Sequence, residues 1–102
     1  MINQLTTEQF EKFMLKFNDK SVWLKVLCGT VNVDMYYENF EFLIFNTLNK
    51  YQFGHLDYNE ENNHQNIMIK IDDIEEIHIS SIFDDEITLI LCNGIEVIIE
   101  LI

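Results

Sequence analysis

Acidic side chains that gather at three expected turns are the residues of this chain best suited to chemistry. The first group follows a candidate strand, the second interrupts a run of isoleucines and the third precedes a candidate hairpin. The groups are Asp57, Glu60 and Glu61; Asp72, Asp73, Glu75 and Glu76; and Asp84, Asp85 and Glu86. Carboxylates in such numbers can hold a metal ion, act in acid–base catalysis or attract a cationic surface.

The polar stretch 57–68 fits a calcium-binding loop only at its start. Asp57, Asn59 and Glu61 stand at positions 1, 3 and 5 of an EF-hand loop. Asn62 then replaces the required glycine, and Met68 replaces the bidentate glutamate. His55, His64 and His78 have no metal-ligand spacing among them. We therefore predict no metal site.

Catalytic motifs are also missing from the sequence. The serine pair at 80–81 stands near His78 without forming a nucleophile elbow. The three glycines are isolated, so no glycine-rich loop is present to cradle phosphates. The chain has no arginine, so it offers no bidentate guanidinium for phosphate. We predict that the protein is not an enzyme and needs no cofactor.

The charge is distributed very unevenly along the chain. Residues 1–50 carry six acids and five lysines, a net of −1, whereas residues 51–102 carry twelve acids and only Lys70, a net of −11. Eleven charges correspond to about 19 Å of duplex DNA, which carries one charge per about 1.7 Å. Such a half repels nucleic acid and anionic membranes and attracts a basic protein surface.

These charges predict a small acidic interaction protein that neutralises a basic partner. We expect the ten acids of the three turns to contact that partner, foremost as a nucleic-acid mimic that blocks the groove of a nuclease or defence system. Anti-CRISPR proteins of phages and mobile elements are such inhibitors, and the absence of alanine, proline and arginine indicates an AT-rich genome that suits this source.

Three alternatives remain open on the sequence. The partner could be a toxin nuclease, which would make the chain an immunity protein or antitoxin. The acids could serve only the solubility of a small regulatory domain. A homodimer could form through an exposed sheet edge.

The cellular compartment is predicted from two features that the sequence lacks and from its cysteines. The chain begins without a secretory signal, and no apolar run approaches the length of a membrane span. Cys28 and Cys92 stand among apolar residues, so we expect buried free thiols. Together these features predict a cytoplasmic protein that does not bind a membrane.

The elements that must position the acids begin with a helix over 7–17. Thr6 and Gln9 form a capping box, and Phe10, Phe13 and Phe17 recur at helical spacing. Alternating patterns then predict strands over 21–36 (one bent strand or a hairpin), 39–46, 51–57, 67–71, 74–79, 87–92 and 95–101. We expect one α+β domain, 1–102, with one N-terminal helix followed by a strongly bent antiparallel sheet or small barrel of five to seven strands.

The last two strands flank Asn93-Gly94, which favours a type I′ turn that pairs Cys92 with Ile95 and Ile90 with Val97. If the preceding strands form a meander, the first and third acidic groups merge into one rim. The second group then lies at the opposite end, near Asn93-Gly94. The predicted core contains seven side chains, which are Phe10, Phe13, Phe17, Val26, Ile69, Ile90 and Val97.

Overall fold

A computed structural model describes residues 2–54, 66–80 and 85–102. Its strands are β1 (Ile2–Gln4), β2 (Val22–Cys28), β3 (Val31–Tyr37), β4 (Glu41–Phe45), β5 (Lys50–Gly54), β6 (Asn66–Lys70), β7 (Ile74–Ser80), β8 (Glu86–Leu91) and β9 (Glu96–Leu101). The helix α1 (Thr7–Met14) follows β1, and 3-10 turns cover η1 (Leu15–Phe17), η2 (Asn46–Leu48) and η3 (Ile71–Asp73). The predicted α+β class is therefore confirmed.

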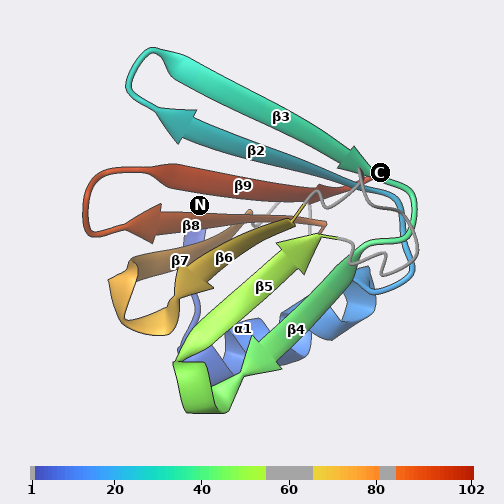
Figure 1. Cartoon of the computed structure of the whole chain (residues 1–102), viewed down its shortest axis with the longest axis horizontal. Coiled ribbons are helices and arrows are strands. Elements are labelled where there is room, and N and C mark those ends of the chain that lie inside the picture. Colours follow the sequence, from blue (N-terminus) through green and yellow to red (C-terminus); the bar gives the residue numbers. More distant parts are fainter. Residues whose placement is uncertain (1, 55–65, 81–84) are drawn as a thin grey trace.

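The strands form two antiparallel sheets rather than a closed barrel. The larger has the order β1-β7-β8-β9-β2-β3 and the smaller the order β4-β5-β6 (Figure 1). Segment 21–36 is a hairpin, so eight strands follow the helix instead of five to seven. The chain passes from one sheet to the other at η3, which breaks the expected meander between β6 and β7.

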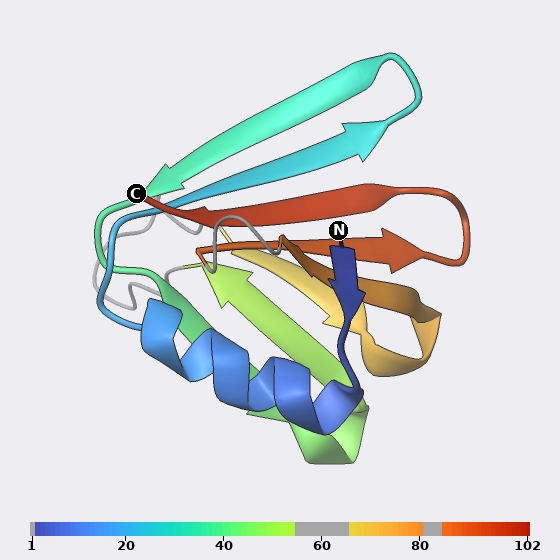
Figure 2. The same ribbon diagram turned by 180° about the vertical axis from the view of Figure 1, so that it is seen from behind.

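Helix α1 covers the inner face of the small sheet (Figure 2). The Thr6 side chain accepts from the Gln9 N–H, and the Gln9 side chain accepts from the Thr6 N–H, so the predicted capping box is present. The Phe10 ring lies 5.6, 5.3 and 6.3 Å from the rings of Phe42, Tyr51 and Phe53. Together α1 and η1 fill the predicted range 7–17. None of the helices in the described ranges could cross a bilayer.

The inner face of the large sheet completes the core. Its fully or nearly fully buried side chains are Val22, Leu24, Tyr37, Ile77, Ile87, Leu89, Val97 and Ile99. Of the predicted core, Phe10, Phe17, Ile69 and Val97 are buried, and Phe13 and Val26 are partly buried. The placement of Ile90 in the core is wrong, because it pairs with Glu96 on the opposite face of the sheet.

The β8–β9 turn explains this error. The Gly94 N–H donates to the Leu91 carbonyl, and the Leu91 N–H donates to the Ile95 carbonyl, both over 2.9 Å. Within residues 92–94 only Gly94 has a positive φ, of +85°, so the loop has three residues and is not the two-residue type I′ turn. The register is shifted by one and pairs Leu89 with Val97. That shift places the buried side chains of Leu89 and Val97 opposite each other on the inner face of the sheet.

Both cysteines lie at hairpin ends, not in the core. Cys28 ends β2 and Cys92 belongs to the β8–β9 turn, and each is an exposed free thiol. The prediction of buried thiols is wrong because Cys28 is the last residue of β2 and Cys92 follows the last residue of β8, where the chain turns away from the core.

Candidate protein-interaction surface

The side chains on the outer face of the large sheet are exposed or only partly buried, in contrast to the buried side chains of its inner face. Along β2, for example, Val22 and Leu24 point into the core while Trp23 is 39% exposed. We define the outer face by register as Asn32, Asp34 and Tyr36 on β3; Trp23, Lys25 and Leu27 on β2; Glu96, Ile98 and Glu100 on β9; Glu86, Thr88 and Ile90 on β8; and Glu76 and His78 on β7. The sheet thus presents a broad mixed surface of apolar and acidic groups.

One row across this face combines aromatic and acidic side chains. Tyr36 pairs with Trp23, Trp23 with Glu100, and Glu100 with Glu86, so the four residues lie in register across β3, β2, β9 and β8. The Trp23 and Tyr36 rings are 5.5 Å apart in an edge-on arrangement, and Tyr36 is 46% exposed. We call these four residues the aromatic–acidic row.

The outer face is strongly anionic. It carries five carboxylates and one lysine; the acids are Asp34, Glu76, Glu86, Glu96 and Glu100. The imidazole of His78 lies 3.6 Å from the Glu76 carboxylate, which is an ion pair only when the histidine is protonated. Glu86 and Glu100 stand directly opposite each other, an arrangement of like charges that destabilises a sheet.

This arrangement is suited to a cationic side chain of another protein. Tryptophan and tyrosine attract lysine or arginine through their ring faces, and adjacent carboxylates accept the N–H groups. Exposed Trp and Tyr are also the residues that most often dominate binding energy at interfaces. The row therefore combines an apolar anchor with carboxylates that form no ion pair with a cation among the residues that the structure describes.

Of the second predicted acidic group, Asp73 lies at the β8–β9 turn. The Cys92 N–H donates to the Asp73 carbonyl over 2.9 Å, and the Cys92 thiol lies 3.9 Å from Asp73 Oδ1. Asp72 is exposed beside it in η3. Glu75 is exposed at a bulge in β7, and Glu76 belongs to the outer face.

The third group is divided. Glu86 belongs to the aromatic–acidic row, and the Asp85 carbonyl accepts from the Leu101 N–H over 2.7 Å. Asp84 lies outside the described residues, as do Asp57, Glu60 and Glu61 of the first group. The predicted six-acid rim is therefore untested.

Four functional candidates on the outer face were missed by the sequence reasoning, namely Trp23, Tyr36, Glu96 and Glu100. A weak signal existed, because the alternation in 21–28 places Trp23 opposite the apolar face. The pairing of β2 with β9, which brings Trp23 beside Glu100, joins distant parts of the chain and has no local signal.

Metal chemistry finds no support in the described ranges, where no three His, Cys, Asp or Glu side chains gather to hold an ion. The EF-hand-like start at Asp57, Asn59 and Glu61 lies outside those ranges. No protein-family model matches this chain, and searches among curated proteins and solved structures also give no match.

Proposed function

We propose that this chain is a small acidic protein that binds a basic protein surface through the outer face of its large sheet. The observation that carries the proposal is the aromatic–acidic row, in which Glu86 and Glu100 face each other beside the exposed Trp23 and Tyr36. Folding alone gives no reason to place two carboxylates opposite each other. A cationic side chain of a partner would relieve their repulsion and stack on the rings.

The partner class that fits best is a nucleic-acid-binding groove. Such a groove contacts phosphates through lysine and arginine side chains, and the outer face offers them five carboxylates against a single lysine. In this proposal the chain acts in the cytoplasm as an inhibitor of a nuclease or defence system, as anti-CRISPR proteins of phages and mobile elements do. It binds no nucleic acid itself, because its charge repels phosphates.

The test is inhibition of purified basic nucleases. A panel of CRISPR effector nucleases and toxin nucleases from low-GC bacteria is incubated with the protein, and cleavage of a labelled oligonucleotide is followed from 0.05 to 0.5 M salt. We expect inhibition of at least one enzyme that weakens as salt rises, because screening shortens the attraction. A toxin nuclease as the only target would identify an immunity protein.

Two double variants locate the surface. Glu86→Gln/Glu100→Gln removes two charges from the row, and Glu8→Gln/Glu11→Gln removes two from α1. The first should raise the inhibitory concentration at least tenfold and the second should change it less than twofold. Equal inhibition by both variants, or no inhibition of any enzyme in the panel, would overturn the proposal.

A further inference from the structure

Strand β3 forms one edge of the large sheet, with no strand on its outer side among the residues that the structure describes (Figure 1). It has seven residues and is longer than the other edge strands, β1, β4 and β6. It pairs with β2 at all seven positions without a bulge, and it contains neither lysine nor proline. Bulges, lysine and proline usually protect an edge, because its open N–H and C=O groups can pair with another chain. The edge at β3 is therefore unprotected.

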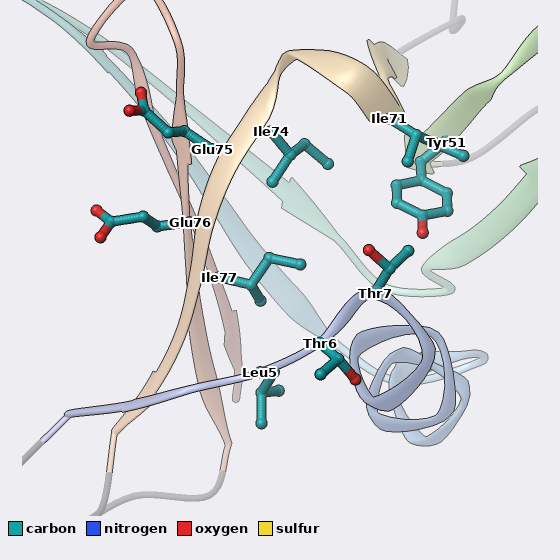
Figure 3. A pocket seen from close by; sticks show the side chains of 9 residues that line it. All are labelled: Leu5, Thr6, Thr7, Tyr51, Ile71, Ile74, Glu75, Glu76 and Ile77. Atoms are coloured by element: carbon teal, nitrogen blue, oxygen red, sulfur yellow. The ribbon is translucent and has the colours of Figure 1, made fainter.

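The opposite edge of the large sheet is protected. β1 covers only three residues, and the Leu5 N–H then donates to the Ile77 carbonyl over 2.8 Å before the chain turns into α1. Beyond that point β7 has a bulge between Ile74 and Glu76. The carboxylates of Glu75 and Glu76 point away from the side on which the isoleucines lie (Figure 3). A bulge and charged side chains discourage pairing, so β3 is the edge of this sheet to which a strand can be added.

The free backbone groups of β3 belong to Asn32, Asp34 and Tyr36. The Ile102 N–H donates to the Ser21 carbonyl over 3.0 Å, so the odd-numbered residues of β2 bond to β9 and the even-numbered residues bond to β3. Even-numbered residues of β2 stand opposite odd-numbered residues of β3. The even-numbered residues of β3 therefore direct their N–H and C=O groups out from the edge.

The surface at this edge is apolar and has no net charge. Val31 and Val33 belong to the inner face, yet they are 61% and 47% exposed, because α1 and the small sheet lie away from the β2–β3 turn (Figure 2). Residues 21–37 carry one lysine and one aspartate, Lys25 and Asp34, which stand opposite each other in register. Two copies of a chain with a net charge of −12 therefore repel each other least at this hairpin. An apolar, uncharged edge fits an apolar, uncharged strand, and β3 of a second copy is such a strand.

The register of such a pair follows from the side chains. Residues with free backbone groups must stand opposite each other, and a register centred on Asp34 would oppose two carboxylates. A register centred on Val33 places Asn32 opposite Asp34 on both sides of the axis, so that the amide donates to the carboxylate. Val31 then stands opposite Met35. No other register without opposed carboxylates pairs as many residues of β3 and also covers both exposed valines.

We propose that this protein forms a symmetric dimer in which β3 pairs antiparallel with β3 of a second copy, centred on Val33. Both copies use the same strand, so two-fold symmetry closes the contact and the assembly stops at two copies. The contact is at the low end of interface sizes, below about 1,200 Å² in total, so the dimer dissociates on dilution. Both outer faces stay open on one side of a continuous sheet, and the inference does not depend on the proposed function.

Disulfide cross-linking tests the register. In a Cys28→Ser/Cys92→Ser background, Val33→Cys places two thiols at a non-hydrogen-bonded pair, whose Cα atoms are about 4.5 Å apart and within disulfide range. We expect oxidised glutathione to convert this variant to a covalent dimer on a non-reducing gel. The control is Val31→Cys in the same background, because the two copies of that position lie about 13 Å apart along the strands. It should cross-link at least fivefold more slowly, and equal rates or no cross-linking of Val33→Cys would overturn the proposal.

Sedimentation velocity tests the dimer itself. The dimer fraction of the wild type should rise with protein concentration and between 0.05 and 0.5 M salt, because screening weakens the repulsion between two anionic copies. Binding of a basic partner has the opposite salt dependence, so the two proposals fail separately. A wild type that is monomeric at about 0.5 mM protein in 0.5 M salt, where repulsion is screened, would exclude the dimer.

Point variants locate the contact. Val33→Lys opposes two ammonium groups at the axis and should lower the association constant at least tenfold, although it reduces the net charge of each copy. Met68→Lys makes the same change at an exposed residue of β6 and should leave dimerisation intact. Asn32→Asp, a conservative change at an exposed side chain, places a second carboxylate opposite Asp34 and should also weaken the dimer. A dimer that persists in both Val33→Lys and Asn32→Asp would form through another surface and contradict the proposal.

Discussion

Glu86 and Glu100 form a directly opposed cross-strand pair on β8 and β9, with Trp23 next to Glu100 in the same row. Like charges in this position cost a sheet about 0.2–1 kcal/mol relative to neutral pairs. Lys25 lies on the same face of β2, two residues from Trp23. It makes no ion pair with any carboxylate in the described ranges, so it does not offset this cost. We infer that binding, not folding, accounts for the residue types at these two positions.

Replacing one member of the pair by lysine should stabilise the fold. Glu100→Lys converts an opposed like-charge pair into an opposite-charge pair, so the free energy of unfolding should rise by about 0.5–1 kcal/mol. Urea denaturation at 0.05 M salt measures the gain, which should shrink at 0.5 M salt because the side chains are partly exposed.

The matched control is Glu96→Lys. Glu96 lies on the same strand and face, and its neighbours in register are Ile90 and Leu27 instead of an acid. Both variants change the net charge by the same amount. An equal stability gain in the two would assign the effect to overall charge and not to the Glu86–Glu100 pair.

The helix should be held chiefly by Phe10. Its ring is fully buried against three aromatic rings of the small sheet, whereas Phe13 is only partly buried and carries the Lys16 ammonium 3.9 Å from its ring centre. Phe10→Ala should therefore lower the free energy of unfolding by about 3–5 kcal/mol. Phe13→Ala should cost less than half of that in the same urea measurement. A larger loss for Phe13→Ala would mean that α1 docks with a different face.

Local signals predicted the helix well and the strand pairing poorly. The capping box at Thr6 and Gln9 and the phenylalanine spacing act within a few residues, so they determine 7–17 almost alone. Asn93-Gly94 fits both a two-residue type I′ loop and a three-residue loop with glycine in the left-handed region. The choice depends on which face of β8 and β9 is buried, and that depends on distant packing.

The interaction surface also depends on strand pairing that local sequence signals do not determine. The acidic groups could be located at turns from composition, and Asp73 does lie at the β8–β9 turn as expected. The aromatic–acidic row, however, exists only because β9 pairs with both β8 and β2. Each of its side chains is unremarkable within its own strand, so the row becomes visible only in the assembled sheet.

The turn geometry gives a further prediction at Gly94. Its φ of +85° is a conformation that L side chains rarely adopt, although a Cβ there would meet no atom within 4 Å. Gly94→Ala should therefore lower the free energy of unfolding by about 1–2 kcal/mol through backbone strain alone. Gly94→Asn should cost less, because asparagine tolerates the left-handed region. Thermal unfolding of both variants measures this difference, and equal costs would contradict strain as the cause.

The buried tyrosines should make stability depend on alkaline pH. Burial raises the pKa of Tyr37 from 10.0 to about 12, and the hydroxyl donates to Met35 Sδ. Because the folded pKa lies above the unfolded value, the folded state holds this proton more tightly. The contribution to stability is complete below pH 10 and is lost as the pH rises from 10 to about 12.

Tyr37→Phe removes this contribution, so its free energy of unfolding should fall less steeply than that of the wild type between pH 10 and 12. Urea denaturation at pH 7 and at several pH values in that range gives the comparison, which cancels the titration of lysines common to both proteins. Absorbance at 295 nm should also show one fewer tyrosine that ionises late in the folded state. Parallel pH profiles for the two proteins would show that Tyr37 ionises alike in the folded and unfolded chains.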